Sequence, residues 1–143
     1  RTNIIENVEY VSKDADGNKY TIKAAKGEID ILNPNILFLT KVSALIQLVN
    51  SDDITIISDY GKYNSDNFDT IFSKNVIINY SNHKINANYL DFSLEKNLMF
   101  ISKNVVYTDS ENIMKSDIIE VDIKTKDIKV FMYNEHDKVN IKK

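Results

Sequence analysis

The stretch that decides the fold is Ser58-Asp59-Tyr60-Gly61-Lys62-Tyr63-Asn64. Its pattern starts with a small residue and has a second defined position three residues later. An apolar or aromatic residue follows five residues after the start, and a short polar residue follows six residues after it. The pattern is present four times, as Ala24-Gly27-Ile29-Asp30, Ser58-Gly61-Tyr63-Asn64, Ala87-Leu90-Phe92-Ser93 and Ser116-Ile119-Val121-Asp122. The copies start 34, 29 and 29 residues apart, and a valine follows each of the first three starts by eighteen residues, at Val42, Val76 and Val105. Such periods are typical of chains that stack one supersecondary unit on the next. We therefore predict a stacked, elongated structure.

The repeating unit is predicted to consist of β-strands. Ile, Val, Phe, Tyr and Thr dominate segments such as 54–57, 76–80, 105–107 and 128–132, and these residue types fit a pleated surface better than a helix. Polar segments separate them, and with only three glycines and one proline the turns must use mainly Asn and Asp. The expected fold class is all-β, with one domain of stacked strand-turn-strand repeats over residues 1–143.

Composition excludes several classes of function. The formal net charge is −3 with both signs interspersed, which predicts neither a nucleic-acid footprint nor a polybasic membrane patch. The chain has no cysteine, so disulfides and thiolate chemistry are excluded. It contains no run of eighteen or more apolar residues. Because it begins Arg1-Thr2-Asn3 without an initiator Met, we expect an upstream segment outside this sequence.

Residue types that carry catalysis or bind metals are sparse. His83 and His136 lie in polar, turn-like contexts without metal-site spacing, and we assign them no role. The run 14–18 has its glycine at the fourth rather than the sixth position, which favours a hairpin turn over a calcium loop. The acidic pairs, such as Asp52 with Asp53, fall in turn segments, and there is no phosphate loop or nucleophile elbow. We expect no catalytic residue, no metal, no cofactor and no enzyme activity.

The apolar residues admit two interpretations. They can interlock in a closed core, or two sheets can remain apart so that the same side chains line a groove for acyl chains, at about 0.8 kcal/mol per buried methylene. Periodicity does not distinguish a closed core from an open groove, because a turn between the third and fifth positions of each copy can reverse which side chains point inward. The groove candidates are Ile22, Ile29, Phe38, Val42, Ile56, Tyr63, Phe72, Val76, Ile78, Phe92, Phe100, Val105 and Val121.

Four stretches carry a resemblance to a known family: 14–29 (DADGNKYTIKAAKGEI), 57–64 (ISDYGKYN), 72–76 (FSKNV) and 115–122 (KSDIIEVD). Together they resemble the LptC family, the periplasmic bridge proteins of lipopolysaccharide export within the OstA-like superfamily. The resemblance spans about residues 4–133. It is a pattern of weak repeats rather than a catalytic signature. The Asp-rich turn before Tyr20-Thr21-Ile22-Lys23-Ala24 favours LptC over its soluble relative LptA.

This resemblance implies a V-shaped antiparallel β-jellyroll, or β-taco, whose interior receives the acyl chains of lipid A. It implies that the protein takes lipopolysaccharide from the inner-membrane ABC transporter and passes it to an LptA-like periplasmic bridge protein. Such proteins are periplasmic and held to the inner membrane by an N-terminal helix, which is absent from this chain. No cofactor and no nucleic acid are expected as partners.

Edge strands are templates for pairing with another protein. Ile128, Val130, Phe131 and Met132 belong to a β-prone segment beyond the last full repeat, and we expect them at the edge that meets the next bridge protein. The alternative is a terminal strand covered by residues 138–141. The N-terminal segment 4–10 is expected to face the transporter.

Three alternative functions stay open. The first is a soluble LptA-like bridge protein, which a cleaved signal peptide in place of an anchoring helix would favour. The second is a structural or adhesive β-solenoid with a closed core. The third is a carbohydrate-active enzyme, which would require two inward-pointing carboxylates beside a cleft.

Overall fold

The chain forms one antiparallel sheet in which each strand pairs with its neighbours in sequence. The computed structural model describes residues 3–132 and 138–141. Ten strands follow one another across the sheet without a crossover. They are β1 (Asn3–Lys13), β2 (Lys19–Ile29), β3 (Ile36–Gln47), β4 (Ile54–Asn64), β5 (Thr70–Tyr80), β6 (His83–Ser93), β7 (Leu98–Thr108), β8 (Ile113–Asp122), β9 (Ile128–Phe131) and β10 (Lys138–Ile141). The predicted all-β class is confirmed.

The predicted hairpin turn at residues 14–18 is confirmed between β1 and β2. Its first residue, Asp14, accepts hydrogen bonds at Oδ1 from the backbone N–H groups of Asp16 and Asn18, at 3.0 and 2.9 Å. This is the local bonding that makes aspartate a turn residue. The connection between β2 and β3, residues 30–35, contains Pro34 and was not predicted.

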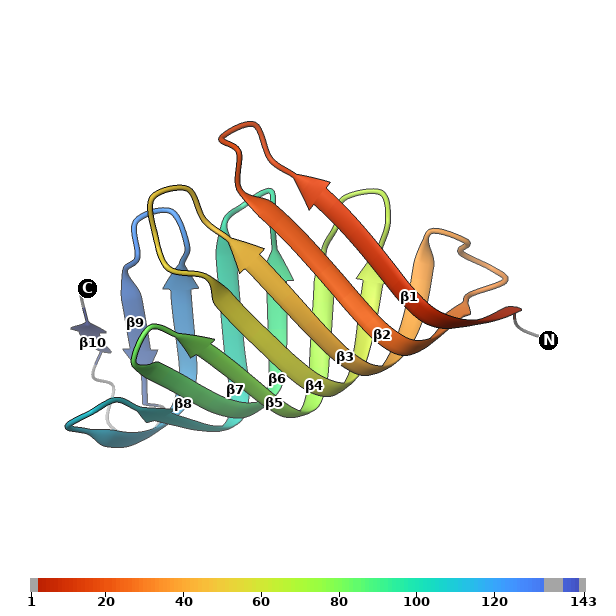
Figure 1. Cartoon of the computed structure of the whole chain (residues 1–143). Helices are drawn as coiled ribbons and strands as arrows, with labels where there is room; N and C mark the ends of the chain where they lie inside the picture. The colour runs from red at the N-terminus through yellow and green to blue at the C-terminus, as the bar shows by residue number, and fades with distance from the viewer. Residues whose placement is uncertain (1–2, 133–137, 142–143) are drawn as a thin grey trace.

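The sheet bends along a line that crosses the strands near their middles, which we call the crease. Strand pairing is interrupted or shifted there, for example between Ile57 and Tyr60 of β4. Alternate strands carry residues of positive φ on this line, a conformation that asparagine tolerates better than most residues. These residues are Asn7, Lys41, Lys74, Asn75, Lys103 and Asn104. The bend folds one sheet into two layers joined along one side, the V shape that the family resemblance implied (Figure 1).

The two layers are named by the loops at their outer ends. Layer A contains the strand halves that end at loops 30–35, 65–69, 94–97 and 123–127, and layer B those that end at turns 14–18, 48–53, 81–82 and 109–112. The space between the layers is the core.

The repeated sequence pattern produces the crease. In each copy the small residue is buried on the layer B side, and the residue three positions later is buried on the layer A side. In a regular strand two residues three positions apart point to opposite faces. The alternation of inward and outward side chains is therefore interrupted once between them. The reversal therefore lies between the first and second pattern residues, earlier in each copy than we expected. Valines pair with the small residues along the inside corner, as Ala24 with Val42, Val42 with Ser58, Val76 with Ala87 and Val105 with Ser116.

Contacts between the layers show that they are offset along the sheet. The Tyr20 hydroxyl of β2 lies 2.7 Å from Thr70 Oγ1 of β5, and its ring packs against Phe92 of β6 at 4.9 Å between centroids. Tyr10 of β1 stacks on Tyr63 of β4 at 5.1 Å. In these contacts layer B of β1 and β2 packs on layer A of a strand three or four positions later. This offset ties β1 and β2 firmly to the middle of the sheet.

Candidate functional site

The structure places most of the predicted groove residues between the layers. Nine of the thirteen are buried in the core: Ile22, Ile56, Tyr63, Phe72, Phe92, Ile78, Val42, Val76 and Val105. Ile29 and Val121 are half-buried and pack against that core. These eleven positions are compatible with a lipid-facing interior, and their contact with lipid remains a prediction.

The remaining two candidates, Phe38 and Phe100, lie on the outer face. Phe38 is 45 % exposed and stands between the buried Leu37 and Leu39. Phe100 similarly stands between the buried Met99 and Ile101. Because successive side chains of a strand point to opposite faces, both phenylalanines point away from the core. Their assignment to the groove is wrong, since an uninterrupted apolar run does not reveal which alternate residues face inward.

Side chains of the described residues fill the middle of the space between the layers. Ile56, Phe72, Val76 and Phe92 have no exposed surface at all. Such packing means that a hydrocarbon chain could enter this region only by displacing side chains.

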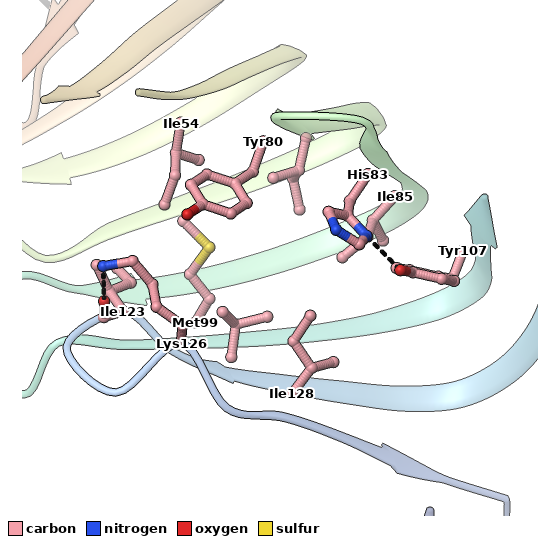
Figure 2. Close-up of a pocket in the computed structure, with 11 residues that line it drawn as sticks. Ile54, Tyr80, His83, Ile85, Met99, Tyr107, Ile123, Lys126 and Ile128 are labelled. Carbon is pink, nitrogen blue, oxygen red and sulfur yellow. Dashed lines mark hydrogen bonds between the residues drawn. The ribbon is translucent and has the colours of Figure 1, made fainter. Parts of the chain in front are cut away.

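An apolar pocket opens between the layers in the C-terminal half of the sheet (Figure 2). Layer B contributes Ile54, Ile78, Tyr80, His83, Ile85 and Tyr107, and layer A contributes Met99, Val121, Ile123, Lys126 and Ile128. Its cavity volume of about 40 Å³ is room for a few water molecules. The pocket can therefore take the end of an acyl chain, and a longer segment requires the layers to separate.

A small polar network lies at the side of this pocket. His83 Nδ1 is hydrogen-bonded to the Tyr107 hydroxyl, which in turn donates to Asp109 Oδ2 at 3.2 Å (Figure 2 shows the first of these). Burial, followed by the hydrogen bond and charge of Asp109, raises the pKa of Tyr107 to about 12. The backbone N–H groups of Glu111 and Asn112 lower the pKa of Asp109. Because a phenol has one hydrogen and Tyr107 gives it to Asp109, the imidazole donates from Nδ1.

A second, larger hollow of about 420 Å³ lies where the β1–β2 turn approaches loops of layer A. Its charged lining residues are Lys13, Asp14, Asp16, Asp66 and Glu95. Four carboxylates against one ammonium make this hollow negative, although Phe68 and Leu94 also line it. It is therefore a poor site for an anionic group.

Only two of the eleven pocket residues, Ile78 and Val121, were among the predicted groove residues, and the missed residues include the basic side chains of His83 and Lys126. His83 was taken as a solvated turn residue, but it is half-buried and lines the pocket. A signal was available, because His83, Ile85 and Ala87 alternate along one strand and the latter two are buried. Lys126 gave no such signal, since the conformation of its turn decides where the side chain lies. His136 lies outside the described residues.

The partner-edge assignment also needs correction. β9 pairs with β8 on one side and with β10 on the other, so it is an internal strand, as the alternative interpretation stated. Ile128 and Val130 are buried, and Met132 packs against the core. Phe131, the last residue of β9, is half-buried. The edges of the sheet are β1 and β10.

Groups that could carry catalysis or bind a metal are sparse in the part of the chain that the structure describes. There, no Asp or Glu is buried, so the inward carboxylate pair required for glycoside hydrolysis is not found. Residues 3–132 and 138–141 contain no group of three or more His, Asp or Glu side chains placed to hold a metal. No helix among them is long and apolar enough to cross a membrane.

The bent sheet and its apolar interior define a two-layer, open-ended β-jellyroll. The family model of LptC-related lipopolysaccharide-assembly proteins matches residues 2–132, which is nearly the whole chain. The chain therefore belongs to the LptC family, and its role lies in lipopolysaccharide transport and assembly. No curated protein matches it.

Proposed function

We propose that this protein carries lipopolysaccharide through the periplasm, with acyl chains of the lipid held between its two layers. It receives the lipid at the inner-membrane ABC transporter and passes it to an LptA-like bridge protein. The observation that carries the proposal is the apolar pocket between the layers of a chain that belongs to the LptC family.

The pocket is where the layers are best placed to separate. The hydrogen bond and ring contacts described between the layers involve β1, β2, β4, β5 and β6, whereas the pocket extends to β7, β8 and the start of β9. Separation there exchanges contacts of Ile, Met and Val side chains for contacts with hydrocarbon. Each methylene that enters contributes about 0.8 kcal/mol, so a long acyl chain offsets the contacts that are lost. Because no directional bond holds hydrocarbon, the lipid can slide.

The two edge strands are the proposed contacts with partners. β1 and β10 each have one neighbour in the sheet, so their outer backbone groups can pair with a strand of another protein. We assign β1 to the transporter and β10 to the next bridge protein. Pairing at both ends would align the interiors of successive domains.

Site-specific photocrosslinking tests the lipid site. A photoreactive phenylalanine analogue is placed at Tyr80, which lines the pocket, or at Phe38, an aromatic residue on the outer face. We expect a lipopolysaccharide adduct from position 80 and little or none from position 38. Equal yields from the two positions, or adducts from position 38 alone, would refute binding between the layers.

The close packing of the interior favours one alternative, a structural β-solenoid with a permanently closed core. Phe72 and Phe92 have no exposed surface, as a closed core requires. In that case position 80 gives no lipid adduct while the protein remains folded.

Anchoring separates the LptC-like role from a soluble LptA-like one. We propose that a helix upstream of this chain holds the protein to the inner membrane, as a single domain facing the periplasm. The full-length product should then fractionate with inner membranes and resist extraction by salt. Release into the soluble periplasmic fraction would favour the LptA-like role.

A further inference from the structure

One cation lies at the mouth of the apolar pocket. Lys126 belongs to the loop between β8 and β9, where its backbone has φ +69° and its N–H donates to the Asp122 carbonyl at 2.8 Å. This backbone turn directs the side chain back over the pocket. Its Nζ donates to the Ile123 carbonyl at 3.1 Å, and Figure 2 shows the Lys126 side chain beside Met99. Lys126 is half-buried, so its ammonium is held beside the pocket rather than extended into water.

This ammonium lacks an acidic partner among the described residues. None of the eleven residues lining the pocket is Asp or Glu. Within residues 3–132 no carboxylate lies close enough to Lys126 to form an ion pair. An ammonium has three hydrogens to donate, and the Ile123 carbonyl takes one. Lys126 can therefore donate further hydrogen bonds to an acidic ligand group.

The two hollows between the layers differ in charge. The pocket combines an apolar base with an ammonium at its mouth, whereas the larger hollow near the β1–β2 turn has four carboxylates and one lysine. An anion is attracted to the first and repelled by the second. A molecule with an acidic head and an apolar tail is complementary to the pocket at both of its ends.

We propose that the mouth of this pocket is a headgroup site for an anionic amphiphile. The phosphate or carboxylate of the ligand accepts hydrogen bonds from Lys126 Nζ, and the first methylenes of its tail lie between Tyr80 and Met99. The inference rests on the proposed function, because it specifies how the acyl-binding interior recognises a charged lipid. Lys126 would fix the position of the headgroup while the tail remains free to slide.

Three probes distinguish the contribution of the ligand's charged headgroup to binding from that of its apolar tail. Dodecyl phosphate, dodecyl maltoside and inorganic phosphate are each titrated below micelle-forming concentrations, and binding is followed through the NMR signal of the Met99 methyl group. The Lys126→Met variant removes the charge and keeps an apolar side chain, and Lys126→Arg keeps the charge. Lys124→Met is the matched control, since Lys124 is an exposed lysine of the same loop.

We expect Lys126→Met to weaken binding of dodecyl phosphate about tenfold, the loss of one charge-assisted hydrogen bond. Lys126→Arg should retain most of the affinity and Lys124→Met all of it. Dodecyl maltoside should bind each variant equally, and inorganic phosphate should leave the Met99 signal unmoved. The thermal midpoint of each variant checks that the fold is retained.

Three outcomes would overturn the inference. Equal weakening by Lys126→Met and Lys124→Met would show a general effect of net charge, and no weakening by either would show that the headgroup binds elsewhere. Binding of inorganic phosphate as tight as that of dodecyl phosphate would show an anion site that does not use the tail. In each case, a shift of the Met99 methyl NMR signal on addition of dodecyl maltoside would still support the proposed acyl site. If no amphiphile shifts Met99, the proposed function fails as well.

Discussion

The hydrogen bond between Tyr20 and Thr70 joins the two layers and makes a quantitative prediction. Tyr20 is 1 % exposed and Thr70 is fully buried, and their side-chain oxygens are 2.7 Å apart. Thr70 Oγ1 also donates to the Phe68 carbonyl at 3.2 Å, so the Tyr20 hydroxyl is the donor in the bond between layers. The two ends of this bond should therefore respond differently to mutation.

Tyr20→Phe removes the donor and leaves the donor bond of Thr70 to Phe68 in place, so we expect a loss of about 1 kcal/mol in the free energy of unfolding. Thr70→Val leaves the buried Tyr20 hydroxyl without an acceptor, which costs about 1–3 kcal/mol. In the double variant no buried donor is left unsatisfied. The double variant should therefore lose less than the sum of the single losses, by about 1 kcal/mol.

Urea unfolding followed by circular dichroism measures all four proteins of this cycle. Additive losses, or a greater loss for Tyr20→Phe than for Thr70→Val, would contradict the assigned hydrogen-bond direction and its role between the layers.

The same variants connect stability to function. Because Tyr20→Phe weakens a contact that holds the layers together, it should increase binding of dodecyl maltoside if the layers separate to admit the tail.

Three further predictions concern the crease and the buried tyrosines. A Cβ added at Gly27 would lie 2.9 Å from a methyl group of Val8, whereas a Cβ added at Gly61 would lie 3.2 Å from its nearest side chain. Gly27→Ala should therefore lower the free energy of unfolding by about 1 kcal/mol, as measured by urea unfolding. The loss should be greater than for Gly61→Ala. Asn75 has φ +51°, so Asn75→Ala should cost about 1–2 kcal/mol while Asn75→Gly costs less. Burial raises the pKa of Tyr63 to about 12, so the contribution of Tyr63 to stability should be constant below pH 10 and be lost as pH rises toward 12.

Each of these has a result that would contradict it. Equal effects at the two glycines would show that the corner of the crease is not tightly packed at Gly27. A smaller loss for Asn75→Ala than for Asn75→Gly would show that the chain entropy of glycine outweighs the strain of positive φ, since both variants lose the 2.7 Å bond of Asn75 to Asp59. The alkaline decline arises because the unfolded tyrosine ionises near pH 10 and the folded one does not, so Tyr63→Phe should reduce it. A Tyr63→Phe profile identical to the original would place the effect elsewhere.

Much of the fold was predictable because strands and turns are local. The β-prone segments, the Asp14–Asn18 hairpin and the repeat period all appear as predicted. The site was less predictable. Phe38 and Phe100 were assigned to the wrong face, and the edge was placed at β9 rather than at β10. Both errors come from the same cause, since facing and pairing depend on register across strands rather than on the residues of one segment.

The repeating unit and its period can be read from the sequence: there are four copies of one pattern, and each starts with a small residue that pairs with a valine of a neighbouring strand. Tertiary structure alone decided what lies between the layers. The offset of three or four strands brings Tyr20 to Thr70 and leaves the pocket between Tyr80 and Lys126 open. Residues so far apart in the chain meet only through the accumulated bend and twist of the whole sheet, which no single repeat encodes.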